Sequence, residues 1–166
     1  MANVVHTPTL HDLFDRSIQI EKQAELIYKE LEKRFAHHPE AAALWNALAA
    51  DEAIHAQVLA QALESASPEK LASQAPAEVW ANVQEILDRM DQDLLGSIKS
   101  LKDAYELAHQ LEYSEVNAIF EFLTVDAVPG NVERAFVRTH IIKHQKRLTD
   151  FSEGYRGKDW EEVVPQ

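Results

Sequence analysis

The sequence predicts an all-α protein in which four long helices form a bundle, with one long crossover between the second and third helices. Apolar residues recur at spacings of three and four in four long windows, as they do along a helix with one buried face. No segment shows the alternation of apolar and polar residues that is typical of a half-buried strand. A short, a long and a short connection join the helices, which is the order of a four-helix bundle with one crossover.

The first predicted helix covers residues 10–35, and its boundaries have local causes. Thr9 and Asp12 have the spacing of a capping box, with aspartate in the position usually held by glutamate. The segment His37-His38-Pro39 ends this helix because a residue that precedes proline is driven out of the α region. Pro39 suits the first position of the second helix, which is predicted to run to residue 65.

The remaining elements are bounded by proline, glycine and serine. The connector is expected at 66–97 with a helix over about 76–95, the third helix over about 97–123, the turn at 128–130, and the fourth helix over about 132–151 with Asn131 as N-cap. The tail from Gly154 is expected to be irregular. Together these elements predict a single domain, residues 1–166, with its core bundle at about 10–152.

The charge balance and the lack of cysteine exclude several classes of function. The chain has 16 basic and 28 acidic residues, a formal net charge of −12, and no cysteine. It can therefore form no disulfide, no cysteine-ligated metal site and no thiol nucleophile. Nucleic acids and anionic membranes both attract Lys and Arg, so neither is expected as a partner. No spanning segment or secretory signal is visible, and we expect a soluble, cytoplasmic protein.

Each predicted helix interrupts its apolar face near the middle with carboxylate or imidazole side chains. A buried, unpaired carboxylate is costly and needs a positive partner, yet only Arg147, on the flank of the fourth helix, lies near this level. Oxygen and imidazole ligands together suit iron, manganese or zinc, and this many carboxylates favour a two-metal site over a structural zinc. The predicted metal ligands are Glu21, Glu52, His55, Glu112, Glu115, His140 and His144.

The two halves of the chain repeat this pattern imperfectly. A glutamate on the first helix of each half precedes a histidine on the second, by 34 residues in one half and 32 in the other. When 51–55 is aligned with 140–144, Ile141 takes the place of the glutamate in the second copy. We interpret the pattern as a degenerate internal duplication. Either His140, one residue away, replaces the missing ligand, or the second metal position is weak and the site holds one ion.

This pattern resembles the ferritin-like superfamily of di-iron carboxylate proteins, and most closely its rubrerythrin branch. The segments that carry the resemblance are 20–28, 51–55 and 111–115, and it extends over roughly 10–152. It implies a ferritin-like four-helix bundle that holds two metal ions, with iron favoured over manganese and zinc. Glu115, one turn after Glu112, is similar to the additional glutamate of rubrerythrins and is therefore expected to act in catalysis by shifting with the oxidation state of the metal.

The resemblance also implies a function. It predicts a non-haem iron protein that reduces peroxide or oxygen, or oxidises ferrous iron, and that pairs as a homodimer. Rubrerythrins commonly carry a four-cysteine rubredoxin module, but this chain has no cysteine. We therefore expect an external electron donor. Two alternatives stay open: a metal-binding bundle with an incomplete site and no redox turnover, and a non-catalytic assembly protein.

Overall fold

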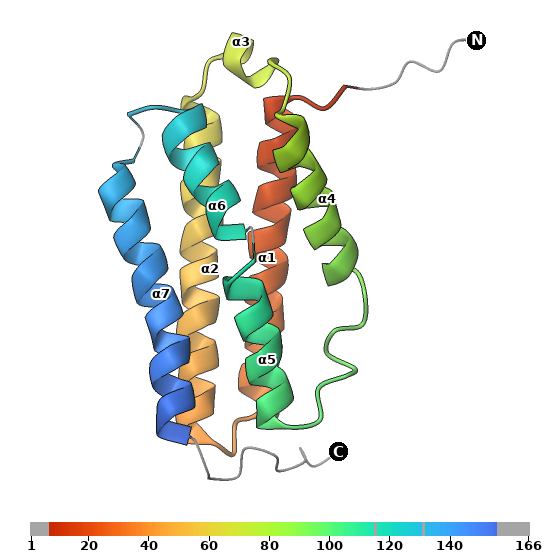
Figure 1. Ribbon diagram of the computed structural model, residues 1–166, viewed down its shortest axis with the longest axis vertical. Helices are drawn as coiled ribbons and strands as arrows, with labels where there is room; N and C mark the ends of the chain where they lie inside the picture. Colours follow the sequence, from red (N-terminus) through yellow and green to blue (C-terminus); the bar gives the residue numbers. More distant parts are fainter. Residues whose placement is uncertain (1–6, 115, 131, 156–166) are drawn as a thin grey trace, which may run out of the picture.

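Four columns of helix lie side by side along the long axis of the protein (Figure 1). The computed structural model describes residues 7–114, 116–130 and 132–155. Three columns are single helices, and the fourth is built from two helices placed end to end: α1 (Leu10–Arg34), α2 (Pro39–Ser65), α7 (Arg134–Tyr155), and α5 (Leu101–Glu112) followed by α6 (Val116–Glu121). Strands are absent from the described residues, where Thr9 and Gln74 form an isolated bridge. The predicted all-α bundle is confirmed.

The first two helices begin where the local signals place them. The Thr9 hydroxyl accepts a hydrogen bond from the Asp12 amide at 3.3 Å, and the Asp12 carboxylate accepts one from the Thr9 amide at 2.8 Å. This reciprocal pair is the predicted capping box. Pro39 is the first residue of α2, whose free first-turn amide positions tolerate a proline. Short-range chemistry therefore determines both helix starts.

The long connection crosses the full length of the bundle. After α2, the short α3 (Pro68–Leu71) lies across one end, and α4 (Ala77–Met90) runs back beside α1 (Figure 1). An extended segment then reaches the other end, where α5 begins. The predicted crossover is confirmed, although its helix ends five residues earlier than the sequence suggested.

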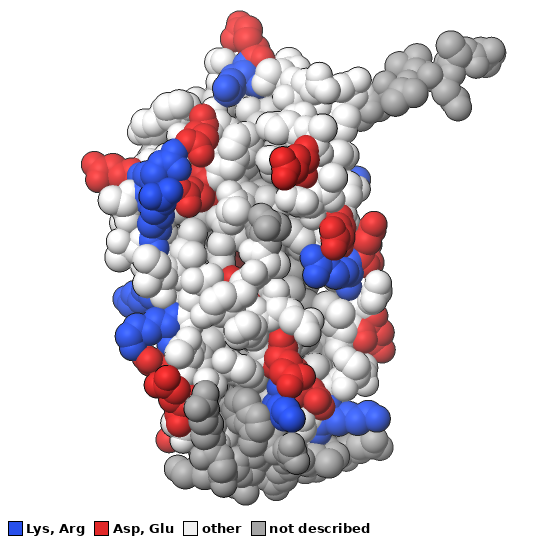
Figure 2. Space-filling model, viewed as in Figure 1, with Lys and Arg blue, Asp and Glu red and all other residues white. Residues whose placement is uncertain are grey.

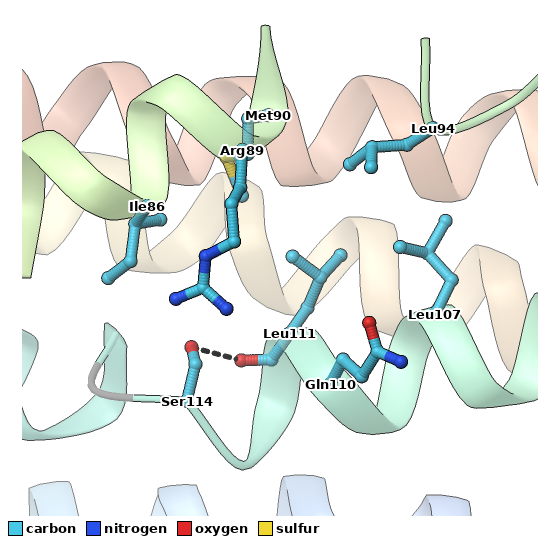
Figure 3. Close-up of a pocket in the computed structure, with 8 residues that line it drawn as sticks. All are labelled: Ile86, Arg89, Met90, Leu94, Leu107, Gln110, Leu111 and Ser114. Atoms are coloured by element: carbon cyan, nitrogen blue, oxygen red, sulfur yellow. Dashed lines mark hydrogen bonds between the residues drawn. The ribbon is translucent and has the colours of Figure 1, made fainter. Parts of the chain in front are cut away.

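The column that contains α5 and α6 is interrupted where a continuous helix over 97–123 was predicted. Helix α5 ends at Glu112, α6 begins at Val116, and a π-helix, η1 (Phe122–Ala127), completes the column. The Ser114 hydroxyl donates to the Leu111 carbonyl at 2.7 Å (Figure 3). The Asn117 amide group donates to the Glu112 carbonyl at 2.6 Å. Side chains that bond the backbone in this way compete with helix continuation.

The last helix is longer than predicted. Helix α7 runs to Tyr155, so Gly154, expected in an irregular tail, is helical. The predicted N-cap Asn131 and the tail after Tyr155 lie outside the described residues. Among the helices that are described, none combines the length and apolar character needed to cross a membrane.

The core consists of two apolar clusters with a polar layer between them. One cluster contains Ala24, Trp45 and Leu148, and the other contains Ile20 and Leu59. On every column the two clusters are separated by buried polar side chains, namely Glu21, Asp51, Glu52, His55, Glu112 and His144. On the face shown in Figure 2, charged side chains form small groups of both signs with uncharged surface between them. The inward-facing acids are therefore distinct from this solvated surface.

Candidate metal centre

The structure brings five of the seven predicted ligands into the polar layer. Each of the five is at most 4% exposed, and all four columns contribute: Glu21 from α1, Glu52 and His55 from α2, Glu112 from α5, and His144 from α7. The His140 side chain, one turn before His144, is 24% exposed and lies at the edge of the layer. Glu115 lies outside the described residues, so its place in the site and its catalytic role remain predictions.

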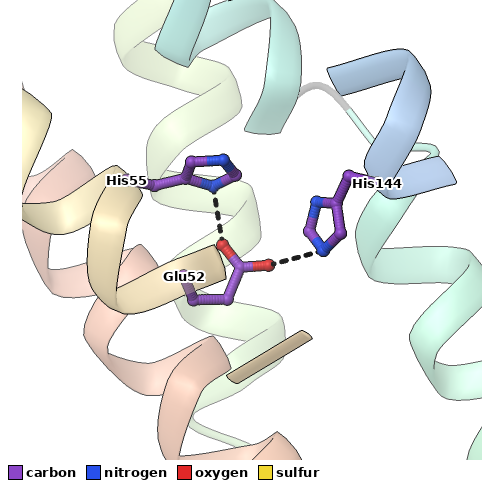
Figure 4. Close-up of side chains that lie close together, drawn as sticks. All are labelled: Glu52, His55 and His144. Atoms are coloured by element: carbon purple, nitrogen blue, oxygen red, sulfur yellow. Dashed lines mark hydrogen bonds and ion pairs between the residues drawn. The ribbon is translucent and has the colours of Figure 1, made fainter. Parts of the chain in front are cut away.

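The Glu52 carboxylate lies between two imidazoles (Figure 4). Its Oε2 is 2.9 Å from His55 Nδ1, and its Oε1 is 3.6 Å from His144 Nε2. These three residues can each present one ligand atom such that all three atoms lie within 4.8 Å of one another. A single ion placed among them could contact all three.

Two further carboxylates complete the layer. Glu21 Oε2 is 3.6 Å from His55 Nδ1, and Glu112 Oε2 is 3.1 Å from His144 Nδ1. The other Glu112 oxygen accepts a hydrogen bond from the Tyr28 hydroxyl, which is buried in the adjoining apolar cluster. The centre therefore has three carboxylates and two imidazoles from four columns.

Several ligand atoms in the layer have no hydrogen-bond partner among the residues that the structure describes. They are Glu21 Oε2 and both ring nitrogens of His144. A buried polar atom without a partner costs about 1–3 kcal/mol, so native proteins rarely leave three together. A divalent cation would satisfy Glu21 Oε2 and one ring nitrogen of His144, since the two nitrogens of one imidazole point in different directions. The oxygen and imidazole donors are those that iron, manganese and zinc accept. The residues present thus fit a metal.

Burial and mutual repulsion shift the pKa values of these groups strongly. Burial, helped by the Glu21 carboxylate, raises the pKa of Glu52 to about 8. Burial also raises the pKa of Glu112 well above its ordinary value. Burial opposes a charge on His55, but attraction to the nearby Glu21 and Glu52 carboxylates outweighs it and raises the pKa of His55 to about 11. Burial, with the charge of His55, lowers the pKa of His144 to about 3. The layer accommodates its negative charge only beside a positive partner.

Comparison with known proteins identifies the family. The sequence model of the rubrerythrin family matches residues 12–126, which is more than half of the chain and includes Glu21, Glu52, His55 and Glu112. The chain belongs to the rubrerythrin family. The crystal structure of a ferritin-like diiron-carboxylate protein from Thermotoga maritima superposes with a TM-score of 0.61 and 22% identity, over 92% of this chain and 97% of that one. That likeness supports the ferritin-like fold. No curated protein matches the chain.

In this rubrerythrin-family chain an ion pair that the sequence did not predict borders the centre. Arg147 Nη1 contacts Asp51 Oδ2, and the Asp51 carboxylate lies 3.8 Å from His144 Nε2 and 4.0 Å from His140 Nε2. The sequence offered two signals: Asp51 adjoins Glu52, and Arg147 was the one basic residue near this level. Their pairing across 96 positions joins α2 to α7 and neutralises one buried carboxylate.

Helix α7 of this rubrerythrin-family chain presents His140 to the site. His140 Nδ1 is 3.2 Å from His55 Nε2, whereas Ile141 packs against an apolar cluster. Positions 140 and 144 are one turn apart, so they share a helix face. Helix α7 therefore brings two imidazoles and no carboxylate to the layer within the described residues.

Proposed function

We propose that this rubrerythrin-family protein binds two iron ions in the polar layer and reduces peroxide or oxygen with electrons from an external donor. The buried cluster of carboxylate and imidazole groups carries the proposal, because those groups are the ligands that iron prefers and three of their atoms lack a hydrogen-bond partner among the described residues. Glu21, Glu52, His55, Glu112 and His144 would hold the ions. Ferrous ions, when bound, supply electrons and open coordination positions for the oxidant.

The chain contributes geometry and exclusion of water. Glu52 faces one imidazole with each of its oxygens, so each oxygen would be available to hold a metal ion beside an imidazole. Tyr28 holds Glu112 by a hydrogen bond and thereby fixes which Glu112 oxygen faces the centre. The two apolar clusters enclose the layer, and a dry site strengthens each charge interaction within it.

We infer that a separate donor supplies the electrons to the centre. Reduction of one peroxide to two waters takes two electrons and two protons. The 166 residues contain no cysteine and hence no four-cysteine electron relay. We therefore expect a separate reductant to return the ferric ions to the ferrous state.

One observation favours a second candidate function. Helix α7 provides no described carboxylate to the layer, because Ile141 packs into the apolar cluster. A centre that lacks this ligand could bind one ion without redox turnover. In that case Ile141→Glu should raise the metal stoichiometry from one to two, as measured by elemental analysis.

Redox turnover can be tested directly. Protein loaded with ferrous iron without air is mixed with known amounts of peroxide or oxygen, and ultraviolet–visible absorption is recorded. The proposal expects oxo-type absorption and two electrons consumed per peroxide. Glu52→Ala should remove both signals, while Glu64→Ala, an exposed position on the same helix, should keep them. Iron that binds but is not oxidised supports the second candidate, and absorption no stronger than that of Glu52→Ala contradicts the proposal.

A further inference from the structure

A small apolar pocket meets the metal centre at its most exposed edge. It lies between α2, α6 and α7, has a volume of about 20 Å³, and is lined by six apolar residues together with His55 and His140. A volume of this size holds one molecule comparable to water. The His140 side chain is 24% exposed, whereas the side chains of the five buried ligands are at most 5% exposed. The pocket is therefore where the layer approaches the outside.

The lining of this small pocket admits apolar molecules more readily than charged or hydrogen-bonding ones. Ile54, Val58 and Phe120 are among its apolar residues, and no carboxylate, ammonium or guanidinium group of the described residues contributes to it. A hydrated cation would lose solvation that this lining does not replace, at a cost of several kcal/mol. Peroxide would lose hydrogen bonds to water. An apolar diatomic molecule loses almost nothing and gains from leaving water.

Other openings suit such a molecule less well. A larger pocket of about 50 Å³ between α4 and α5 is lined by Arg89, Gln110 and Ser114, among others, but by none of the six predicted ligands that the structure describes (Figure 3). At the second edge of the layer, Asp51 is covered by the Arg147 guanidinium, whose side chain is 33% exposed and whose charge repels cations. Unlike the pockets beside α4, α5 and α1, this small pocket combines an apolar lining with contact to predicted ligands among the described residues.

We propose that dioxygen reaches the centre through this pocket, where it contacts His140 and His55. The inference rests on the proposed function and narrows its substrate, since the polarity of the lining favours dioxygen over peroxide and ferrous iron. Ile54, 47% exposed, lies at the mouth. Val137, 1% exposed, lies at the inner wall.

Dioxygen is paramagnetic, so its position can be mapped in the metal-free protein. Methyl proton relaxation is compared under oxygen and under nitrogen. We expect a several-fold larger enhancement at the methyl groups of Ile54, Val58 and Val137 than at Ile142, which is 64% exposed on α7 and does not line the pocket. Enhancement that simply follows exposure, with Ile142 largest, overturns the proposal. Because this experiment needs no iron, its outcome is independent of whether the protein binds metal.

A matched pair of variants tests the route. Ile54→Trp covers the mouth, whereas Ile142→Trp adds the same side chain at an exposed position outside it. Ile54→Trp should abolish the enhancement at Val137 and slow oxidation of the iron-loaded protein by dioxygen about tenfold, as expected when access limits the rate. Its iron affinity should match that of Ile142→Trp. Equal slowing with peroxide and dioxygen would overturn the choice of substrate, and equal rates for the two variants would overturn the route.

Discussion

Glu52 shows how far a single carboxylate depends on its surroundings. Its oxygens face His55 and His144, and burial with the neighbouring Glu21 raises its pKa to about 8. A glutamate in water is charged at neutral pH, but this one retains a proton over part of that range. A metal ion reverses the preference because it stabilises the carboxylate. We therefore expect Glu52 to release its proton when a cation binds beside it.

Glu52→Gln should change the stability of the metal-free protein in a pH-dependent way. The folded pKa of Glu52 exceeds its unfolded value, so its contribution to stability is complete below about pH 4.5 and is lost as the pH rises through 8. Glutamine resembles the protonated acid and escapes this loss. We expect equal stability at pH 4.5 and a more stable variant at pH 9, by about 1.4 kcal/mol for each unit of pKa shift removed.

Thermal and denaturant unfolding of the metal-free protein at the two pH values provide the comparison. Glu64→Gln, at an exposed position of the same helix, serves as the control and should leave stability unchanged at both. Parallel pH profiles for Glu52→Gln and the unaltered protein would show that Glu52 is not held in a costly charged state.

Most site residues could be predicted because their positions depend on helical periodicity, which is local. His140 illustrates the limit. Positions 140 and 141 differ by about 100° on the helix, yet the sequence did not decide between them, and the structure brings His140 to His55 while Ile141 packs into a cluster. Asp51 was missed as well, because its partner Arg147 lies 96 positions away. Pairings between distant helices depend on how those helices pack.

At the scale of the helix, the interruption after Glu112 places a ligand at a helix end. The Glu112 carbonyl accepts hydrogen bonds from the side-chain amides of Asn117 at 2.6 Å and Gln145 at 3.1 Å. The first donor is local, but the second belongs to α7 and is 33 residues away. Apolar spacing alone predicts an uninterrupted helix here, since it carries no information about such donors. The capping box and Pro39, by contrast, act within four residues and were predicted correctly.

Removing the side-chain amide of Asn117 or of Gln145 should destabilise the protein at the break between α5 and α6. Asn117→Ala and Gln145→Ala should each lower the free energy of unfolding by about 1 kcal/mol, the usual net value of one hydrogen bond. The double variant should lose more than the sum, because the two donors share one acceptor. Gln57→Ala, at an exposed position of α2, is the control for denaturant unfolding. If the double variant loses only the sum of the two single losses in unfolding free energy, the two amides do not act together on the Glu112 carbonyl.

Helices α2 and α7 are joined at the edge of the centre by Asp51 and Arg147. Arg147→Ala leaves a buried carboxylate without its cation and should cost about 2 kcal/mol, less than a fully buried pair because the Arg147 side chain is 33% exposed. Lys146→Ala is the matched control, since Lys146 pairs with Asp150 at the surface and should cost less than about 1 kcal/mol. If both variants lose the same unfolding free energy in denaturant, the Asp51–Arg147 pair contributes no more to stability than a surface ion pair.

At the scale of the whole molecule, the two apolar clusters enclose a layer whose protons must leave before a metal can bind. At pH 7 His55 is protonated, since attraction to the Glu21 and Glu52 carboxylates overcomes burial and raises its pKa to about 11. Glu52, with a pKa of about 8, is largely protonated too, and burial raises the pKa of Glu112 well above its ordinary value. Metal ligation needs the deprotonated forms.

Metal binding should therefore release about two protons per chain at pH 7, one from His55 and most of one from Glu52, and strengthen as the pH rises from 5 to 9. Calorimetric titration with a divalent metal in buffers of different ionisation enthalpy measures the protons released. Release should fall toward zero in Glu52→Ala, which cannot form the centre. Release of less than one proton, or affinity independent of pH, would contradict the protonation states assigned to the layer.

The central claim is that the inward-facing acids and imidazoles form an iron centre. The most direct measurement is the iron content of protein that is loaded with ferrous iron without air, desalted and subjected to elemental analysis beside Glu52→Ala. We expect two iron ions per chain in the unaltered protein and a background amount in the Glu52→Ala variant. Unaltered protein that retains no more iron than Glu52→Ala would contradict it.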